Sequence, residues 1–208
     1  MSAASEALES IGRALIATRD RLNEADSAAG DGDLGITVEA IGRTLIELAP
    51  GLIGLTPEAA LRQFGMEVGG RAPSTFGTLL SMGLIGASRS PAVPDEPAVS
   101  TTARLLRAVE TTIATRGKTK RGDKTLLDAL GPAADSVELA ATNRASVASA
   151  VATAAVAAHD GAEATRALEP TVGRQAWLAD RARGSVDPGA LAIALAFAAA
   201  NEALSLER

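Results

Sequence analysis

Cysteine and tyrosine are absent from this 208-residue sequence, and histidine and tryptophan occur once each. Without cysteine the chain can form no disulfide bond, thiolate metal site or cysteine nucleophile. The single histidine, His159, argues against a histidine-rich zinc site and against a Ser-His-Asp triad. A net charge of −5 gives no electrostatic case for nucleic acid binding, which needs a basic face. These absences favour a protein of the reducing cytoplasm that does not bind nucleic acid.

Long apolar runs and a targeting segment are also missing. The N-terminal residues carry no cluster of basic side chains of the kind that opens a signal peptide. The most apolar stretches, residues 145–158 and 189–200, are shorter than the roughly 20 residues of a membrane-spanning helix. We therefore expect no membrane segment and a cytoplasmic location. Both alanine-rich stretches are better explained as buried helices of a bundle.

The composition favours helices over sheet. Hydrophobic residues make up 47% of the chain, but aromatic residues only 2%. A core of Ala, Leu, Ile and Val suits closely packed helices, whereas sheets are enriched in β-branched and aromatic residues. We predict an all-α fold of about eight helices, in a single domain over residues 1–208. The expected helices cover residues 8–22, 38–48, 57–68, 74–88, 100–113, 123–140, 146–168 and 188–204.

Local signals predict several helix ends. Thr56 and Asp187 each precede a proline, the pattern of an N-cap followed by proline at the first helical position. Ser100 is a further candidate N-cap. The pairs Pro50-Gly51 and Gly69-Gly70 are expected to end helices.

Three aspartates, Asp26, Asp31 and Asp33, lie in one glycine-rich segment between two expected helices. Carboxylates so close together repel one another unless a positive charge lies among them. Hard oxygen ligands select hard cations, and Mg²⁺ typically completes its coordination shell with water and phosphate oxygens. The segment therefore suggests a metal-phosphate site. The alternative is a polar turn in which Asp and Gly serve only backbone geometry and helix capping.

The other glycine-containing breaks have a consistent character. Residues 69–75 open a helix, residues 116–125 are basic, and Gly173-Arg174 and Asp187-Pro188-Gly189 follow. A helix N-terminus offers free backbone N–H groups and the positive end of the helix dipole, which suit phosphate. Each break alone is consistent with an ordinary turn. Together they predict a nucleotide–Mg²⁺ site at one end of a helical bundle.

At this point the chain resembles a known family, the nucleotide-binding L subunit, or L domain, of dihydroxyacetone kinases. The resemblance covers nearly the whole chain, with the motifs in the order and spacing of that family. The matching segments are Gly30-Asp31-Gly32-Asp33-Leu34-Gly35, Val68-Gly69-Gly70, Arg116-Gly117-Lys118, Gly122-Asp123-Lys124-Thr125-Leu126-Leu127-Asp128, Gly173-Arg174 and Asp187-Pro188-Gly189-Ala190. It implies an antiparallel eight-helix barrel that binds ADP or ATP with Mg²⁺.

The resemblance also assigns roles to individual residues. It implies that Asp26, Asp31 and Asp33 hold two Mg²⁺ ions that bridge the nucleotide phosphates and act in catalysis. It further implies nucleotide contacts at Leu34, Gly35, Thr37, Gly70, Arg71, Ala72, Gly117, Leu126, Arg174, Asp187, Pro188 and Gly189.

The sequence departs from the family at the phosphate side of the expected site. The family usually has His at the position of Leu34, Asn at Thr37 and a Ser-Gly pair at Ala72-Pro73. Alanine removes a hydroxyl, and proline removes a backbone N–H that could face a phosphate. Arg71 could compensate as a charged donor, and Ser74 or Thr75 could restore a hydroxyl.

The resemblance implies a partner as well. In the family a separate K-type subunit or domain holds the ketose through a histidine, and His159 lies outside every matched motif, as a packing or surface residue. Some members keep ADP bound and receive phosphate from a phosphotransferase-system protein. The alternatives are a nucleotide-loaded regulatory or carrier module, a kinase subunit for a different ketose, and a helical scaffold that has lost its site.

Overall fold

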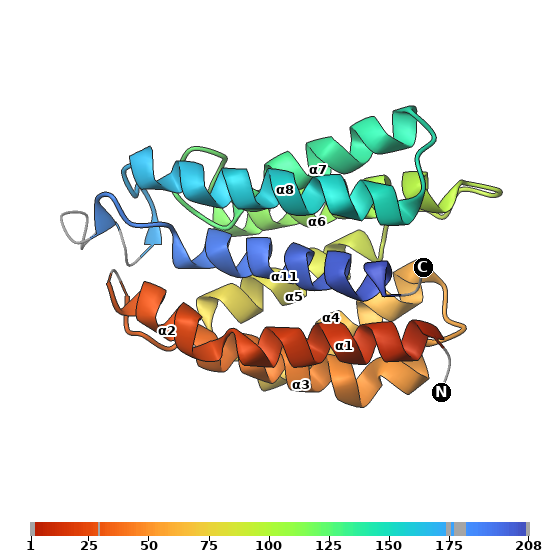
Figure 1. The fold of residues 1–208 in the computed structure, drawn as a ribbon, viewed down its shortest axis with the longest axis horizontal. Coiled ribbons are helices and arrows are strands. Elements are labelled where there is room, and N and C mark those ends of the chain that lie inside the picture. Colours follow the sequence, from red (N-terminus) through yellow and green to blue (C-terminus); the bar gives the residue numbers. More distant parts are fainter. Residues whose placement is uncertain (1–2, 29, 174–175, 177–181, 207–208) are drawn as a thin grey trace.

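The computed structural model describes residues 3–28, 30–173, 176 and 182–206, and all regular structure in these residues is helical (Figure 1). This confirms the predicted all-α class. The helices are α1 (Ala3–Ala17), α2 (Arg19–Ser27), α3 (Leu34–Leu52), α4 (Pro57–Arg71), α5 (Thr75–Ala87), α6 (Ala98–Gly117), α7 (Leu127–Thr142), α8 (Val147–Ala164), the 3₁₀ turn η1 (Thr165–Ala167) and α11 (Pro188–Ser205).

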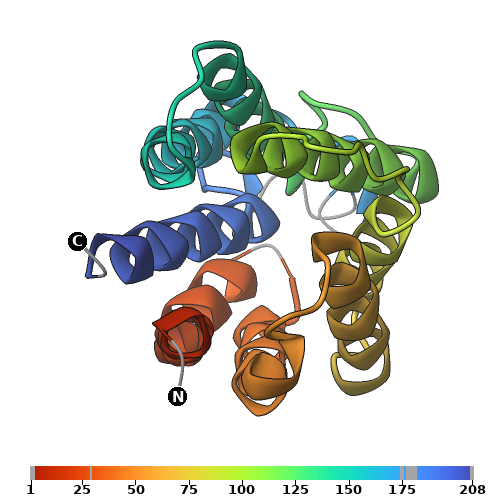
Figure 2. The ribbon, with the colours of Figure 1, turned by 90° about the vertical axis from the view of Figure 1, so that its right-hand side faces the viewer.

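Eight of these helices form a closed ring. In the order α1, α3, α4, α5, α6, α7, α8 and α11, each helix packs against the next, and α11 packs against α1 (Figure 2). The shorter α2 continues from α1 and packs on α3. Successive helices of the ring run in opposite directions, so every second connection lies at the same end of the barrel (Figure 1). The ring confirms the expected antiparallel eight-helix barrel.

Small residues let the helices of the ring approach closely. Ala133, Ala154 and Ala158 are fully buried in the core. A Cβ atom at Gly161 of α8 would lie 2.2 Å from the backbone oxygen of Asp128, so this position accepts only glycine without a shift of the backbone. Close packing of this kind explains how the chain fills its core with few aromatic side chains.

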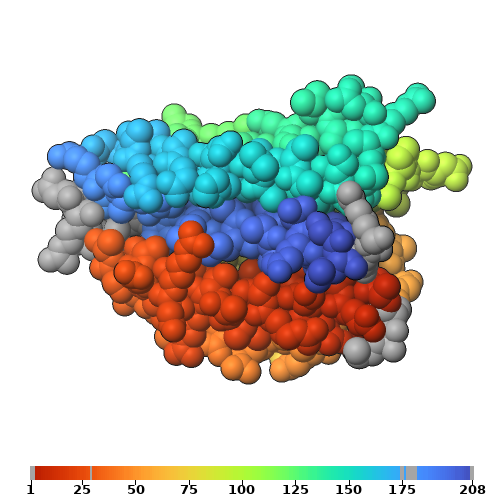
Figure 3. All heavy atoms as spheres, viewed as in Figure 1, coloured from red at the N-terminus to blue at the C-terminus, as the bar shows by residue number. Residues whose placement is uncertain are grey.

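Helix α11 is long and apolar enough, by length and composition, to cross a membrane, and 44% of it is buried within the fold. It lies between α8 and α1 (Figure 3). It also packs against α7. Burial against its neighbouring helices accounts for its apolar character, so we interpret α11 as a core helix, as the sequence suggested.

Two predictions of where a helix is continuous and where it breaks are wrong. The first expected helix is divided at Thr18, whose hydroxyl and backbone N–H both bond to the carbonyl of Leu15. The pair Gly69-Gly70 does not end the third helix, because α4 continues to Arg71. Instead α4 ends just before Pro73, since the residue that precedes a proline is displaced from helical geometry.

Several other predicted ends also shift. Pro50 lies inside α3, and Ser100 lies in the first turn of α6, which begins at Ala98. Residues 123–126 form turns before α7 begins at Leu127. The predicted N-caps Thr56 and Asp187 are confirmed, since their side chains accept hydrogen bonds from the third following residue's N–H.

Candidate functional site

A pocket of about 560 Å³ opens at one end of the barrel, where the connections after α2, α4, α6 and η1 meet. Ten residues predicted from the sequence line it: Asp26, Asp31, Asp33, Leu34, Thr37, Gly117, Leu126, Asp187, Pro188 and Gly189. The fold therefore brings together segments that are far apart in the sequence. Arg174, also predicted to contact the nucleotide, lies outside the described residues.

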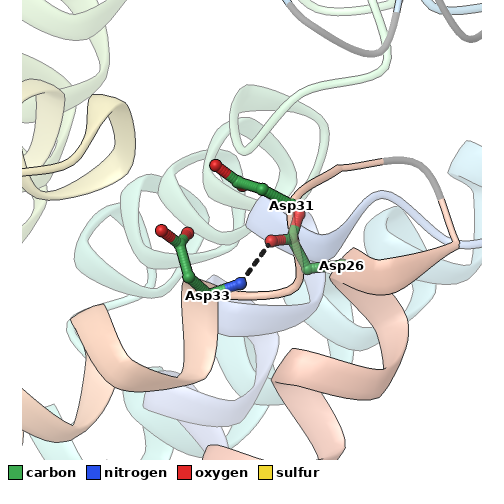
Figure 4. Close-up of side chains that lie close together, drawn as sticks. All are labelled: Asp26, Asp31 and Asp33. Carbon is green, nitrogen blue, oxygen red and sulfur yellow. Dashed lines mark hydrogen bonds between the residues drawn. The ribbon is translucent and has the colours of Figure 1, made fainter.

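The acidic cluster, Asp26, Asp31 and Asp33, lies at the mouth of this pocket. Asp26 belongs to the last turn of α2, Asp31 to the connection, and Asp33 is the N-cap residue of α3. One carboxylate oxygen from each residue lies within 4.8 Å of the other two (Figure 4). Three carboxylates at this spacing form a set of hard oxygen ligands, which suits a divalent cation such as Mg²⁺.

Asp26 also determines the shape of the connection. Its Oδ2 atom accepts hydrogen bonds from the backbone N–H groups of Gly32 at 3.0 Å, Asp33 at 3.0 Å and Leu34 at 3.3 Å. The three donors hold the main chain in a turn that carries the Asp31 and Asp33 side chains toward Asp26. The second carboxylate oxygen of Asp26 remains available as a metal ligand, so the residues present fit a bound cation.

Gly35 supports this turn from behind and does not line the pocket. Its N–H donates a 2.7 Å hydrogen bond to Oδ1 of Asn23. A Cβ atom at Gly35 would lie 2.0 Å from the backbone oxygen of Arg19, so only glycine lets α3 begin so close to α2. Sequence reasoning missed Asn23, because nothing in the local pattern relates it to a glycine twelve positions away.

The start of α5 forms the next wall. Ser74, Thr75, Phe76 and Leu79 line the pocket. The Ser74 hydroxyl accepts a hydrogen bond from the N–H of Gly77 and thereby caps the helix. The Ser74 hydroxyl is therefore occupied in capping, and Thr75 carries a second hydroxyl at this wall. Sequence reasoning missed Phe76 and Leu79, because apolar side chains in a helix fit an ordinary core position equally well.

Three further residues predicted to contact nucleotide lie outside the pocket lining. Arg71 forms ion pairs with Glu47 and Glu67, which hold its guanidinium on the outer surface of α3 and α4. Gly70 is exposed, and Ala72 is buried at the end of α4. The reason is the continuation of α4 through Gly69-Gly70: the expected phosphate loop starts only after Arg71.

The connection between α6 and α7 is held by its own acidic side chains. Oδ2 of Asp123 accepts hydrogen bonds from the Thr119 hydroxyl at 3.1 Å and the Lys120 N–H at 2.9 Å. The Lys120 N–H, with smaller contributions from the Thr171 and Thr119 side chains, lowers the pKa of the Asp123 carboxyl. The Asp128 carboxylate accepts bonds from the N–H groups of Gly122 and Thr125. Both aspartates therefore organise the backbone.

An ionic network fixes the same connection to the barrel. Arg121 pairs with Asp135 of α7 and with Glu110 of α6, each at 2.6 Å, and Arg107 pairs with the same two carboxylates. The hydrogen bonds to Asp135 and Glu110 raise the pKa of Arg121. Because Glu110 is buried, this network orients the connection relative to both helices.

Lys124 lines the pocket, but its ammonium group is directed into the protein. The residue is 2% exposed, and Nζ donates hydrogen bonds to the backbone oxygens of Leu168, Ala182 and Ser185. Burial lowers the pKa of the Lys124 ammonium. The sequence had placed Lys124 in a matched motif without assigning it a role.

The last wall is the start of α11. Oδ2 of Asp187 accepts a 2.7 Å hydrogen bond from the N–H of Ala190, and the Asp187 N–H donates to the Thr165 hydroxyl at 2.8 Å. Pro188 and Gly189 follow in the first turn and face the pocket together with Val172 and Gly173. Apart from Asp187, the residues of this wall are apolar or glycine.

Fold and site together define an all-α barrel. At one end of it, a pocket brings together an acidic cluster that could hold a divalent cation, helix N-termini and an apolar wall. The DAK2 domain family matches residues 28–202. The chain belongs to the DAK2 domain family, which confirms the resemblance to the L-type part of dihydroxyacetone kinases.

The curated relatives are kinases and kinase subunits. The chain is 30% identical over 203 residues to triokinase/FMN cyclase of Rattus norvegicus, covering 95% of this chain and 34% of the rat protein. It is 26% identical over 172 residues to the ADP-binding subunit DhaL of the PEP-dependent dihydroxyacetone kinase of Escherichia coli, covering 81% of this chain and 80% of that subunit. The chain thus spans about a third of the length of the rat protein and most of the length of the Escherichia coli subunit.

A solved structure shares the fold. The dihydroxyacetone kinase of C. freundii in complex with AMP-PNP and Mg²⁺ matches with a TM-score of 0.71 and 25% identity, over 96% of this chain and 33% of that chain.

Proposed function

We propose that this chain is the nucleotide-binding part of a dihydroxyacetone-type kinase, which binds ADP or ATP with Mg²⁺ and serves phosphoryl transfer to a small ketose. The observation that carries the proposal is the meeting of the acidic cluster with the start of α5 in one pocket. Carboxylates are Mg²⁺ ligands, and helix N-termini bind phosphate. The names of the relatives support the same reaction class.

Asp26, Asp31 and Asp33 are the residues that would hold Mg²⁺, with two ions as the family resemblance implies. Bound Mg²⁺ would neutralise negative charge on the phosphate oxygens. The Asp26 turn keeps the carboxylates converged, and the start of α5 offers N–H groups and the Thr75 hydroxyl. Leu34, Phe76 and Leu126 line the pocket with apolar side chains, on which a base would pack.

The ketose would be held by a separate K-type subunit or domain. His159, the single histidine of the chain, is exposed on α8 and lies outside the pocket lining, which supports supply of the acceptor site by another protein. We propose that the chain acts as one L-type domain over residues 1–208, in the cytoplasm, with such a partner.

A second form of the reaction is supported by two relatives. The subunits from Escherichia coli and Listeria innocua are named as ADP-binding subunits of PEP-dependent kinases. In this form the nucleotide stays bound, and a phosphotransferase-system protein supplies the phosphoryl group. The pocket suits either donor, since both reactions need the same nucleotide and metal.

A thermal melt with ADP, with Mg²⁺ and with both tests the proposal. A ligand at about 100 times its Kd adds roughly 2.7 kcal/mol to the free energy of unfolding. For a domain of this size, that should raise Tm by about 5 to 10 °C. We expect the increase to require both ligands.

The matched variants are Asp31→Asn in the acidic cluster and Asp95→Asn, an exposed aspartate in the connection before α6. Asp31→Asn should lose the increase in Tm, and Asp95→Asn should keep it. If wild-type protein freed of co-purified nucleotide shows no increase, the kinase proposal is wrong and the scaffold alternative stands.

A further inference from the structure

The ammonium group of Lys124 is buried and uses all of its protons in hydrogen bonds to the backbone. Its three ammonium protons match three acceptors, the backbone oxygens of Leu168 at 3.1 Å, Ala182 at 2.8 Å and Ser185 at 2.9 Å. An ammonium group offers three donors and no acceptor, so a Lys124 bonded in this way has no proton left for a phosphate oxygen. The side chain is 2% exposed.

The backbone at Lys124 is adapted to this orientation. Its φ angle is +61°, in the left-handed region that non-glycine residues rarely occupy. The flanking Asp123 and Asp128 carboxylates hold the surrounding N–H groups and so maintain that conformation. A residue kept in an uncommon conformation by its neighbours often marks a functional constraint. Here the conformation directs the long side chain inward.

The acceptors of Lys124 lie on both sides of the pocket wall. Leu168 follows η1, whereas Ala182 and Ser185 immediately precede the Asp187 cap of α11. Val172 and Gly173, on the Leu168 side, and Pro188, on the Ser185 side, line the pocket. One ammonium group therefore ties together the two chain segments from which this wall is built.

We propose that Lys124 is a positioning residue for the pocket, which sets the distance between the wall segments at residues 172–173 and 187–189 and does not bind phosphate. The predicted effect on ligand binding rests on the proposed nucleotide function. The link that the Lys124 ammonium group makes between the two wall segments, called the tie below, does not. A positioning role predicts equal losses for ligands with and without phosphate. A phosphate-binding role predicts a loss for ADP alone.

The test compares Lys124→Met with Lys118→Met. Both lysines lie in the connection between α6 and α7 with positive φ, +61° and +51°, but Lys118 is exposed and lies outside the pocket lining. Backbone hydrogen exchange is measured without ligand, and the Kd values of ADP with Mg²⁺ and of adenosine are measured by calorimetry. Binding of Mn²⁺ alone reports on the acidic cluster.

We expect Lys124→Met to speed exchange at residues 168–172 and 185–186 while helices α3 and α4 keep their protection. The Kd values of ADP and adenosine should rise by the same factor, about tenfold or more, since disordered binding elements must be ordered again on binding. Mn²⁺ binding should be unchanged, and Lys118→Met should match wild type in every measurement. Unchanged exchange, or a loss restricted to ADP, would overturn the proposal.

Two further outcomes remain decisive. If wild type binds neither ADP nor adenosine, the nucleotide function fails, but the exchange comparison still tests the tie. If Lys124→Met does not fold, hydrogen exchange is measured on the wild-type protein instead. The backbone amides of residues 119–125, 168–172 and 185–186 should then exchange with one common free energy of opening. Separate opening of these segments would contradict the tie.

Discussion

The backbone N–H of Asp33 donates a 3.0 Å hydrogen bond to Oδ2 of Asp26, so one carboxylate of the acidic cluster holds the main chain that carries another. The two residues therefore have different structural roles. Asp26 holds the turn through its Oδ2 atom, whereas the Asp33 side chain projects beside Asp31 (Figure 4).

Asp26→Ala should lower the free energy of unfolding in EDTA by about 1 to 3 kcal/mol, because it leaves three N–H groups without their carboxylate acceptor. Asp33→Ala should lower it by less, because this change removes none of the three hydrogen bonds that Oδ2 of Asp26 accepts. Urea denaturation measures both values. Both variants should lose Mg²⁺-dependent nucleotide binding. If the two variants are destabilised equally, Asp26 has no special role in holding the turn.

Gly35→Ala should be destabilising, by about 1 to 3 kcal/mol, because its Cβ would lie 2.0 Å from the backbone oxygen of Arg19 and would push α2 from α3. Gly70→Ala is the control, since a Cβ there meets open space in a helix. That substitution should stabilise by about 0.5 to 1 kcal/mol. Urea denaturation measures the free energy of unfolding of the two variants. If Gly35→Ala leaves this free energy unchanged, the close contact with Arg19 does not require glycine at this position.

Thr75→Val should weaken ADP binding about fivefold, as expected for the loss of about 1 kcal/mol from one hydrogen bond, and should leave adenosine binding unchanged. The reason is that Thr75 lies in the pocket lining at the first turn of α5, where it can replace the hydroxyl missing at Ala72. Thr78→Val, on the exposed side of the same helix, is the control for calorimetry. Equal loss for adenosine would show that Thr75 acts on the base wall instead.

Stability in acid should depend on Asp135. The hydrogen bond from Arg121, assisted by Arg107, lowers the pKa of Asp135 to about 2, below its ordinary value of 3.8. The ionised carboxylate therefore stabilises the fold above about pH 4, and this contribution is lost as the pH falls toward 2.

Asp135→Asn should accordingly be less stable than wild type at pH 7, and the difference should shrink between pH 4 and pH 2. Urea denaturation across this range measures it, with Asp95→Asn as the control. Because the Asp135 side chain is 52% exposed, salt should reduce the difference. A difference that does not change with pH would mean that the pair adds no stability.

Sequence reasoning succeeded where the relevant residues are close in the chain. The helical repeat of Ala, Leu, Ile and Val determines the fold class, and Asp26, Asp31 and Asp33 come together because one short turn holds them. It failed at Gly69-Gly70, because glycine serves two purposes. A Cβ at Gly69 would lie 2.7 Å from Oγ of Ser81, so this glycine allows α4 and α5 to pack closely and does not end the helix.

Contacts between distant segments could not be foreseen. The acceptors of Lys124 are Leu168, Ala182 and Ser185, more than forty positions away in the sequence. Nothing in the Gly122-Asp123-Lys124-Thr125 motif distinguishes a lysine that binds carbonyl groups from one that binds phosphate. Phe76 and Leu79 likewise fit the apolar pattern of an ordinary helix. Their place in the pocket follows from the order of helices around the ring, which only the tertiary structure supplies.

Helix α11 closes the ring by packing against α1, and its first turn also completes the pocket. The Asp187 turn that begins α11 is also a wall of the pocket, so a nascent chain cannot form the site before α11 has been synthesised. Contacts between such distant segments also slow folding, because a long loop must close before they form. Nucleotide capture should therefore appear late in refolding, together with the docking of α11.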